Sequence, residues 1–130
     1  MRNALAILTV ALLAACAASA PLRIVDARAA CARGDRHVEI TDSGRVIRYL
    51  GIRDSRSGAH EGFLVRFHNG TVSRVEDNVA ITGRIPIHAN DGVTLRGQYE
   101  CDDGVIHWTH HDPSLRHPAG YIDIAGLRYQ

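Results

Sequence analysis

Histidine supplies most of the reactive side chains in this sequence. The chain has 8 histidines, and five of them fall between His88 and His117. The densest stretch reads His-Trp-Thr-His-His-Asp-Pro and runs from His107 to Pro113. Histidine is the commonest side-chain ligand of metal ions and the side chain that titrates near neutral pH. This stretch therefore predicts a site for a small ligand or a divalent metal ion, or a general base.

The spacing of these histidines restricts a metal site. On an extended strand of about 3.3 Å per residue, His107 and His111 would lie ~13 Å apart, too far to bind one ion. The Asp112-Pro113 pair is expected to end the strand, so that His111 and Asp112 bend away and meet. A metal site then needs His111, Asp112 or His117 together with ligands from other strands, such as His60 or His68. The predicted metal ligands are therefore His60, His111 and Asp112.

A second interpretation of the same stretch needs no ligand. Trp108 and Ile106 would face the core, and the histidines would cap turns by hydrogen bonding to the backbone. The sequence contains no HExxH and no paired CxxC metal motif, and no GxSxG nucleophile or phosphate-binding glycine motif. Whether the protein is an enzyme therefore stays open.

Residues 1–20 are typical of an export segment and are excluded from the predicted fold. Their apolar stretch, Ala4 to Ala15, is too short to span a bilayer as a permanent helix. Leu13 to Cys16 resembles a bacterial lipobox, in which the cysteine is lipidated and becomes the mature N-terminus. Ala18-Ser19-Ala20 is a competing cleavage site. The lipobox predicts an exported, periplasmic lipoprotein that meets its membrane through Cys16.

The two remaining cysteines form an even pair. If Cys16 is lipidated or removed, Cys31 and Cys101 are left in an oxidising compartment, which predicts a disulfide. On the chain-entropy model, a bridge that closes a loop of about seventy residues contributes ~4 kcal/mol.

The rest of the chain is predicted to be mainly β. Residues 21–36 are a linker or a short helix, and residues 37–130 form a single domain of short strands. Five to seven strands at roughly ten-residue spacing indicate a small OB-like barrel. A single helical turn is expected over residues 77–82, between the third and fourth strands.

Particular turns and strands follow from local patterns. Phe63, Val65 and Phe67 alternate with polar residues and should share a buried face, and Asn69-Gly70 is a strong hairpin signal. The sequence also predicts a turn at residues 42–44 between two separate strands. Two further strands are expected over residues 84–87 and 105–110.

The charge balance argues against one class of function. The 15 basic residues are all arginine and face 14 acidic residues, for a net charge of +1. A non-specific nucleic-acid binder would carry a broad basic surface, so the sequence has no strong nucleic-acid signal.

The run from Gly97 to Tyr121, closed by Tyr129-Gln130, resembles short exported bacterial proteins grouped as domain of unknown function 3465. The family pattern reads GEYEW…GGxIHWTHHDPxxxHxxGWI…YQ. The stretch from Gly58 to Phe63 also resembles the family's GxRHQRF. The resemblance covers about residues 37–130 and implies an exported OB-like domain, without implying an activity.

The chain departs from that family in one segment. Where the family tends to carry AHNIDLAPR, this sequence matches at Asn78 and Arg84 but has Asp77 in place of the histidine and Ala80 in place of the aspartate. Cys101 replaces a tryptophan of the family pattern. If the family's site uses that histidine, this member is altered in specificity or inactive. An aspartate can still ligate a metal or accept a hydrogen bond.

Three functions are compatible with the sequence. The first is an envelope binding module for a small ligand or a partner protein, the second a metal-assisted or histidine-dependent hydrolase, and the third a structural lipoprotein. The candidate ligand-binding residues share the histidine-rich region or the family motifs, and they are His60, Asn78, Arg84, His107, His110, His111, Asp112 and His117.

Overall fold

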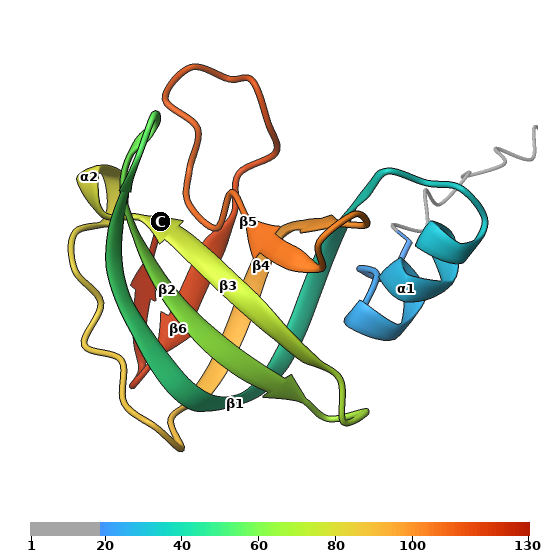
Figure 1. Ribbon diagram of the computed structural model, residues 1–130, viewed down its shortest axis with the longest axis horizontal. Helices are drawn as coiled ribbons and strands as arrows, with labels where there is room; N and C mark the ends of the chain where they lie inside the picture. The colour runs from blue at the N-terminus through green and yellow to red at the C-terminus, as the bar shows by residue number, and fades with distance from the viewer. Residues whose placement is uncertain (1–18) are drawn as a thin grey trace, which may run out of the picture.

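The computed structural model describes residues 19–130 (Figure 1). Seven strands form one sheet, and two helices accompany it. The strands are β1 (His37–Ser55), β2 (Gly58–Phe67), β3 (Val72–Asn78), β4 (Gly92–Glu100), β5 (Val105–His107), β6 (Tyr121–Ile124) and β7 (Leu127–Tyr129), and the helices are α1 (Ile24–Ala32) and α2 (Val79–Thr82). The predicted lipidation site, Cys16, lies outside the described residues.

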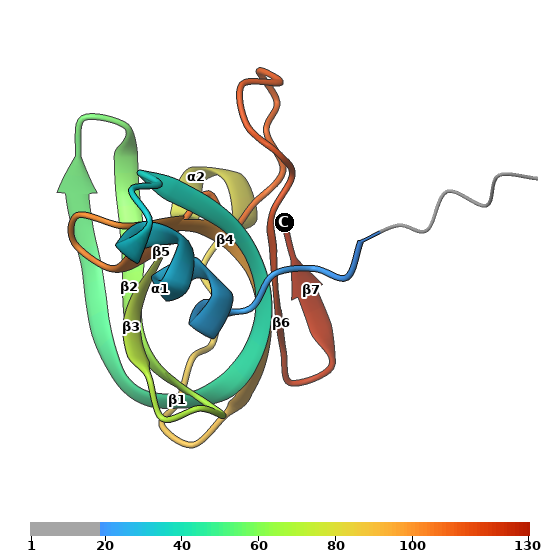
Figure 2. The ribbon, with the colours of Figure 1, turned by 90° about the vertical axis from the view of Figure 1, so that its right-hand side faces the viewer.

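Five of the strands close into a ring. The sheet order is β1-β2-β3-β5-β4-β6-β7, and β4 also pairs with β1. The β3–β5 pair is parallel, and α2 lies between β3 and β4 in the chain. Figure 2 shows the ring nearly end-on, with α1 across one end of it. The predicted mainly β, OB-like architecture with one short helical turn is confirmed.

The ring is filled by apolar side chains at alternating positions. Phe63, Val65 and Phe67 of β2 are 0%, 0% and 2% exposed, as their alternation predicted. The Asn69-Gly70 turn is also confirmed, because Gly70 has a φ of 86° and its N–H donates to the carbonyl of Phe67 at 2.9 Å. Only a residue that tolerates positive φ fits this turn without strain.

The predicted turn at residues 42–44 is wrong, since β1 runs through it without a break. Asp42 is 5% exposed, and its carboxylate accepts hydrogen bonds from the Ile24 N–H at 3.0 Å and from Arg23 at 2.9 Å. The aspartate thus caps the start of α1. Gly44 serves a close approach of β2, because a Cβ there would lie 2.5 Å from the carbonyl oxygen of Arg66. Asp42 and Gly44 are residue types that favour turns, but here the aspartate caps a helix and the glycine lets two strands approach closely.

The predicted strand at residues 84–87 is also wrong. Ile85 and Ile87 are buried, but their segment does not join the sheet. The Ile85 N–H donates to Oε2 of the buried Glu61 at 2.9 Å. A side-chain carboxylate therefore satisfies a backbone group that a neighbouring strand would otherwise pair.

The two cysteines pair as predicted. The Cα atoms of Cys31 and Cys101 lie 5.4 Å apart, within the range of disulfides, and their sulfur atoms are bonded. The bridge joins α1 to the end of β4. Residues 21–36, for which a linker and a helix were both open, therefore contain a helix that is fastened to the ring. In residues 19–130 no helix is long and apolar enough to cross a membrane.

Candidate functional site

The candidate site is a cleft of about 750 Å³. Its lining residues come from the β1–β2 turn and nearby strand ends, from α2 and from the segment of residues 108–120 that follows β5. These elements lie at the same end of the ring (Figure 1). We call it the histidine cleft, because it brings together five of the predicted site residues, namely His60, Asn78, His110, Asp112 and His117. The other described residues that line it are Ser57, Ile81, Trp108, Pro113, Ser114 and Arg116.

The chain leaves the sheet at Trp108 to form this cleft. The predicted strand over residues 105–110 ends instead at His107, because Trp108 has a φ of 55° and cannot continue a strand. The segment returns at Gly120, whose N–H donates to the carbonyl of His110 at 2.8 Å. A Cβ on Gly120 would lie 2.1 Å from the carbonyl oxygen of Trp108. The base of the segment is therefore so tight that only glycine fits.

A buried threonine fastens the same segment to the sheet. Thr109 is 0% exposed, and its hydroxyl lies 2.8 Å from Oδ1 of Asp77 and 3.1 Å from the carbonyl of Glu76. Asp77 also accepts a hydrogen bond from Thr82 of α2. Burial raises the pKa of the Asp77 carboxyl, and the two hydroxyl donors oppose that rise. Asp77 thus joins β3, α2 and the segment.

Asp112 shapes the segment rather than offering a metal ligand. Its carboxylate accepts the backbone N–H groups of Ser114 at 2.8 Å, His117 at 2.8 Å and Arg116. Partial burial raises the pKa of Asp112, but these hydrogen bonds outweigh it and bring the pKa below its usual value. The carboxylate is thereby committed to the fold of residues 112–117.

The three histidines of the cleft share one hydrogen-bonding pattern. His110 and His117 each bring Nδ1 to the backbone carbonyl of the next residue, at 2.6 and 2.9 Å, and His60 brings Nδ1 to the carbonyl of Gly58 at 3.0 Å. A carbonyl oxygen only accepts, so Nδ1 must carry the hydrogen in each ring. In the neutral rings Nε2 is then the basic, accepting nitrogen.

A stack of aromatic rings supports one wall. The Trp108 indole lies between His107 and His117, with ring centroids 4.9 and 4.6 Å apart and interplanar angles of 19° and 11°. His110 meets the His117 ring edge-on at 5.2 Å. The indole therefore stacks on two imidazole rings, and Trp108 is half-buried rather than a core residue. The stack holds His117 and His110 in place.

Three predicted site residues lie elsewhere. His107 points to Glu100, with Nε2 2.7 Å from Oε1, and supports the stack from behind. His111 is exposed and contributes its carbonyl to His110. Arg84 is exposed on the stretch after α2 and does not line the cleft.

The predicted metal ligands are not assembled in this structure. Among residues 19–130, no three His, Cys, Asp or Glu side chains lie close enough together to hold a metal ion. His111 faces solvent and Asp112 is saturated by backbone donors, so that only His60 of that set has a nitrogen available in the cleft.

Sequence reasoning missed the residues that build the site without carrying its chemistry. Thr109 and Gly120 carried no signal beyond their place near the histidines, and the partners of Thr109 are more than thirty positions away. Ser57 and Ile81 also line the cleft, and no sequence pattern singled them out.

The tight base of the segment generates a stability prediction. Gly120→Ala should lower the free energy of unfolding by about 1–3 kcal/mol, because the added methyl group must displace the Trp108 carbonyl. Urea denaturation measures the change. Gly92→Ala is the matched control, since a Cβ there meets no atom within 4 Å, and it should stay within about 0.5 kcal/mol of the wild type. Equal stability of the two variants would contradict the described geometry.

The raised pKa of Asp77 generates a pH prediction. Stability from the protonated carboxyl is present below the unfolded pKa of about 3.8 and is lost as the pH rises through the higher folded pKa. At pH 7, Asp77→Asn should therefore be at least as stable as the wild type, and its relative advantage should shrink as the pH falls.

Asp123→Asn is the control of opposite sign. The hydrogen bond from Arg128 lowers the pKa of Asp123, so its stabilising effect is present above the unfolded pKa and lost as the pH falls. Asp123→Asn should destabilise the protein at pH 7 and not at low pH. Parallel pH profiles of unfolding for the two variants would refute the assignment of Asp77.

Comparison with known families is consistent with the histidine-rich signature. The family model described as Protein of unknown function (DUF3465) matches residues 10–130. No curated protein matches the chain. The match covers most of the sequence and includes every residue of the histidine cleft, so the chain belongs to this family.

Proposed function

We propose that this DUF3465 protein is an exported binding module of the cell envelope, and that it holds a small polar ligand in the histidine cleft. The observation that carries the proposal is the common tautomer of His60, His110 and His117. Each ring donates Nδ1–H to a backbone carbonyl, which leaves three Nε2 acceptors on residues that line one cleft.

The alternative of a purely structural lipoprotein explains only half of this pattern. Turn capping accounts for the Nδ1 contacts, which fix how each ring is turned. It leaves no role for the second nitrogen of each ring. For turn capping alone, an asparagine at position 60 or 110 could donate the same hydrogen bond to the backbone carbonyl. A ligand that donates hydrogens accounts for both nitrogens.

Three acceptors favour a ligand with several hydroxyl groups. A saccharide meets this requirement, and a cleft of about 750 Å³ lies within the range of ligand sites, about 300–1,000 Å³. OB-like barrels commonly bind oligosaccharides, which is a likeness of fold only. We therefore propose an oligosaccharide fragment as the class of ligand to test first.

A divalent metal ion is the second candidate for the same nitrogens. Histidines that bind metals usually donate their other ring N–H to a carbonyl or carboxylate, as these do. The three imidazoles would have to move closer together, because they do not form a metal-holding group in residues 19–130. Metal binding thus requires a rearrangement that saccharide binding does not.

The hydrolase hypothesis lacks a comparable observation. Ser55 Oγ lies 3.1 Å from Nδ1 of His60, the distance of a nucleophile–base pair. That nitrogen already donates its hydrogen to the carbonyl of Gly58, so it cannot accept the serine proton. The contact therefore belongs to the β1–β2 turn.

The binding test uses two substitutions in one segment. His110→Asn keeps an amide near the Nδ1 position to donate to the His111 carbonyl, but it removes Nε2. It should weaken ligand binding about tenfold or more, and the loss of the ring contact with His117 should also lower the unfolding midpoint without ligand, from which each ligand shift is measured. His111→Asn is the matched control, because His111 is exposed and outside the cleft.

The readout is a thermal-shift screen of oligosaccharides, with Zn²⁺, Cu²⁺, Ni²⁺ and Mn²⁺ as parallel arms and a chelator control. A ligand at a hundred times its dissociation constant adds ~2.7 kcal/mol of stability, which raises the midpoint measurably. A shift that His110→Asn abolishes and His111→Asn keeps supports the proposal. If only the metal ions raise the midpoint, the ligand of the cleft is an ion and not a saccharide. If His110→Asn keeps the full shift with a ligand, that ligand does not bind in the histidine cleft, and the proposal is wrong.

Export and anchoring generate a separate prediction. The lipobox-like sequence before Cys16 and a disulfide typical of oxidising compartments support an anchored envelope protein. In a bacterial host, Cys16→Ser should release the protein from the membrane fraction and remove the lipid mass from its N-terminal peptide. If mass spectrometry shows that the unaltered chain is cleaved after Ala20, the predicted lipid anchor is wrong, whereas the predicted export still holds.

A further inference from the structure

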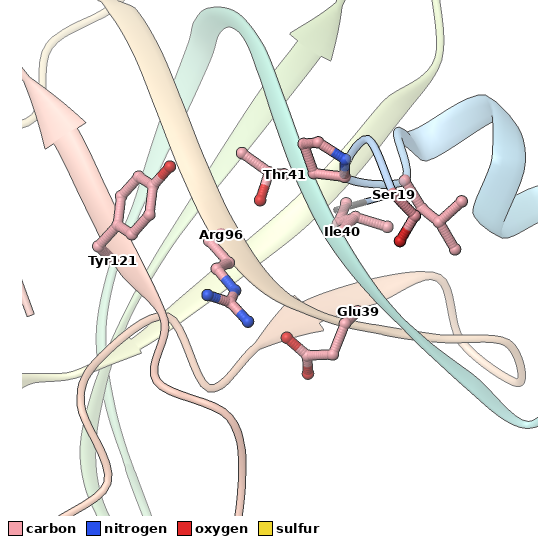
Figure 3. Close-up of a pocket in the computed structure, with 8 residues that line it drawn as sticks. Ser19, Glu39, Ile40, Thr41, Arg96 and Tyr121 are labelled. Carbon is pink, nitrogen blue, oxygen red and sulfur yellow. The ribbon is translucent and has the colours of Figure 1, made fainter. Parts of the chain in front are cut away.

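A second pocket lies on the outer face of the sheet and shares no lining residue with the histidine cleft (Figure 3). Its volume is about 430 Å³, and its walls come from β1, β4, β6 and the segment before α1. The chemistry of this pocket resides in Glu39 of β1 and Arg96 of β4, with Tyr121 of β6 beside them.

Glu39 holds a buried carboxylate without a partner. Neither of its oxygens has a hydrogen bond with any described residue, although both are buried. The residue directly opposite on β4 is Gln98, but the amide of Gln98 donates to Glu100 instead. A buried polar group that lacks a partner lowers stability, and burial raises the pKa of Glu39. The sheet therefore retains a group that does not help the fold.

Arg96 faces the same space. It pairs in register with Thr41, two residues along β1 from Glu39, so that the two charged side chains are diagonal neighbours on one face. Figure 3 shows the guanidinium and the carboxylate turned toward a common space. The guanidinium nevertheless gives no hydrogen bond to Glu39. Opposite charges thus face one another without contact.

The remaining walls are apolar on one side. Pro21 and Leu22 border the pocket, and Leu22 is 46% exposed although its carbonyl is held by the Thr41 N–H at 2.8 Å. The Tyr121 ring is fixed from behind, because the Arg128 guanidinium lies 3.8 Å from its centroid. The pocket thus offers a negative group, a positive group and a short apolar edge.

We propose that this outer pocket binds a free α-amino acid with an apolar side chain. The ammonium group of such a ligand pairs with Glu39 and its carboxylate with Arg96, which can bind a carboxylate through two parallel N–H···O bonds. The two charged groups of an α-amino acid are attached to one carbon, which suits opposite charges held by diagonal neighbours on adjacent strands. The side chain then covers Pro21 and Leu22.

The proposal explains why the sequence keeps an unpartnered carboxylate. If Glu39 is retained for a ligand, its removal should separate stability from binding. Glu39→Gln should raise the unfolding midpoint of the protein without ligand, because a neutral amide is less costly to bury than a carboxylate. The same substitution should remove the response to the amino acid.

The experiment is isothermal titration of the purified protein with leucine and two blocked analogues. Leucinamide lacks the carboxylate and N-acetylleucine lacks the ammonium group, so each should bind about tenfold or more weakly than leucine. Glycine, which lacks the apolar side chain, should also bind more weakly. Glu39→Gln and Arg96→Gln should each abolish the leucine response at millimolar concentration.

Glu76→Gln is the matched control, because it makes the same change of charge on β3, outside this pocket, and should bind leucine as the wild type does. No binding of leucine to the wild type would overturn the proposal, as would equal binding of leucine and N-acetylleucine. A Glu39→Gln variant that binds normally would also overturn it. If Arg96→Gln fails to fold, the Glu39→Gln arm still decides the question.

Discussion

The positive φ of Trp108 is the constraint on which the candidate site depends. At this residue the chain turns out of β5, and it comes back at Gly120 through the bond between the Gly120 N–H and the His110 carbonyl. Had the strand continued, His110 would have paired with a neighbouring strand and could not line a cleft. The segment that leaves the sheet is held by the hydrogen bond from Thr109 to Asp77 and by the stacking of Trp108 on His107 and His117.

Within that frame, each histidine is held by ordinary backbone contacts. The Nδ1 hydrogens go to carbonyls, the carboxylate of Asp112 gathers three N–H groups, and Asp77 links two threonines. These contacts consume the polar groups that shape the site. Among the histidines of the cleft, the Nε2 nitrogens of His60, His110 and His117 are left over, which is the reason to regard the cleft as a binding site.

Much of the fold and part of the site could be predicted from the sequence. The alternation around Phe63, the Asn69-Gly70 turn and the Cys31–Cys101 bridge follow from local patterns or from cysteine parity, and all three are present. The grouping of His60 with the distant histidines followed from the need for a ligand on a second strand. These features depend on residue type and spacing, which the sequence displays directly.

The features that could not be predicted depend on long-range partners. Asp42 is a residue type that favours turns, but its carboxylate accepts a hydrogen bond from the first residue of α1. Asp112 is a residue type that binds metals, but its carboxylate accepts hydrogen bonds from three backbone N–H groups. The isolation of Glu39 is a property of strand register, because Gln98 would satisfy it if Glu100 were elsewhere. Such outcomes need the positions of all neighbours.

The most direct test of the binding-site account is long-range ¹H–¹⁵N NMR of the imidazole nitrogens at a pH where the rings are neutral. We expect His60, His110 and His117 to show a protonated Nδ1 and an unprotonated Nε2, and the Nε2 resonances to move when a ligand binds. Exposed His111 should show the tautomer mixture of a free imidazole and serves as the internal reference. Protonated Nε2 in the three cleft histidines would contradict the account, because the cleft would then present donors in place of acceptors.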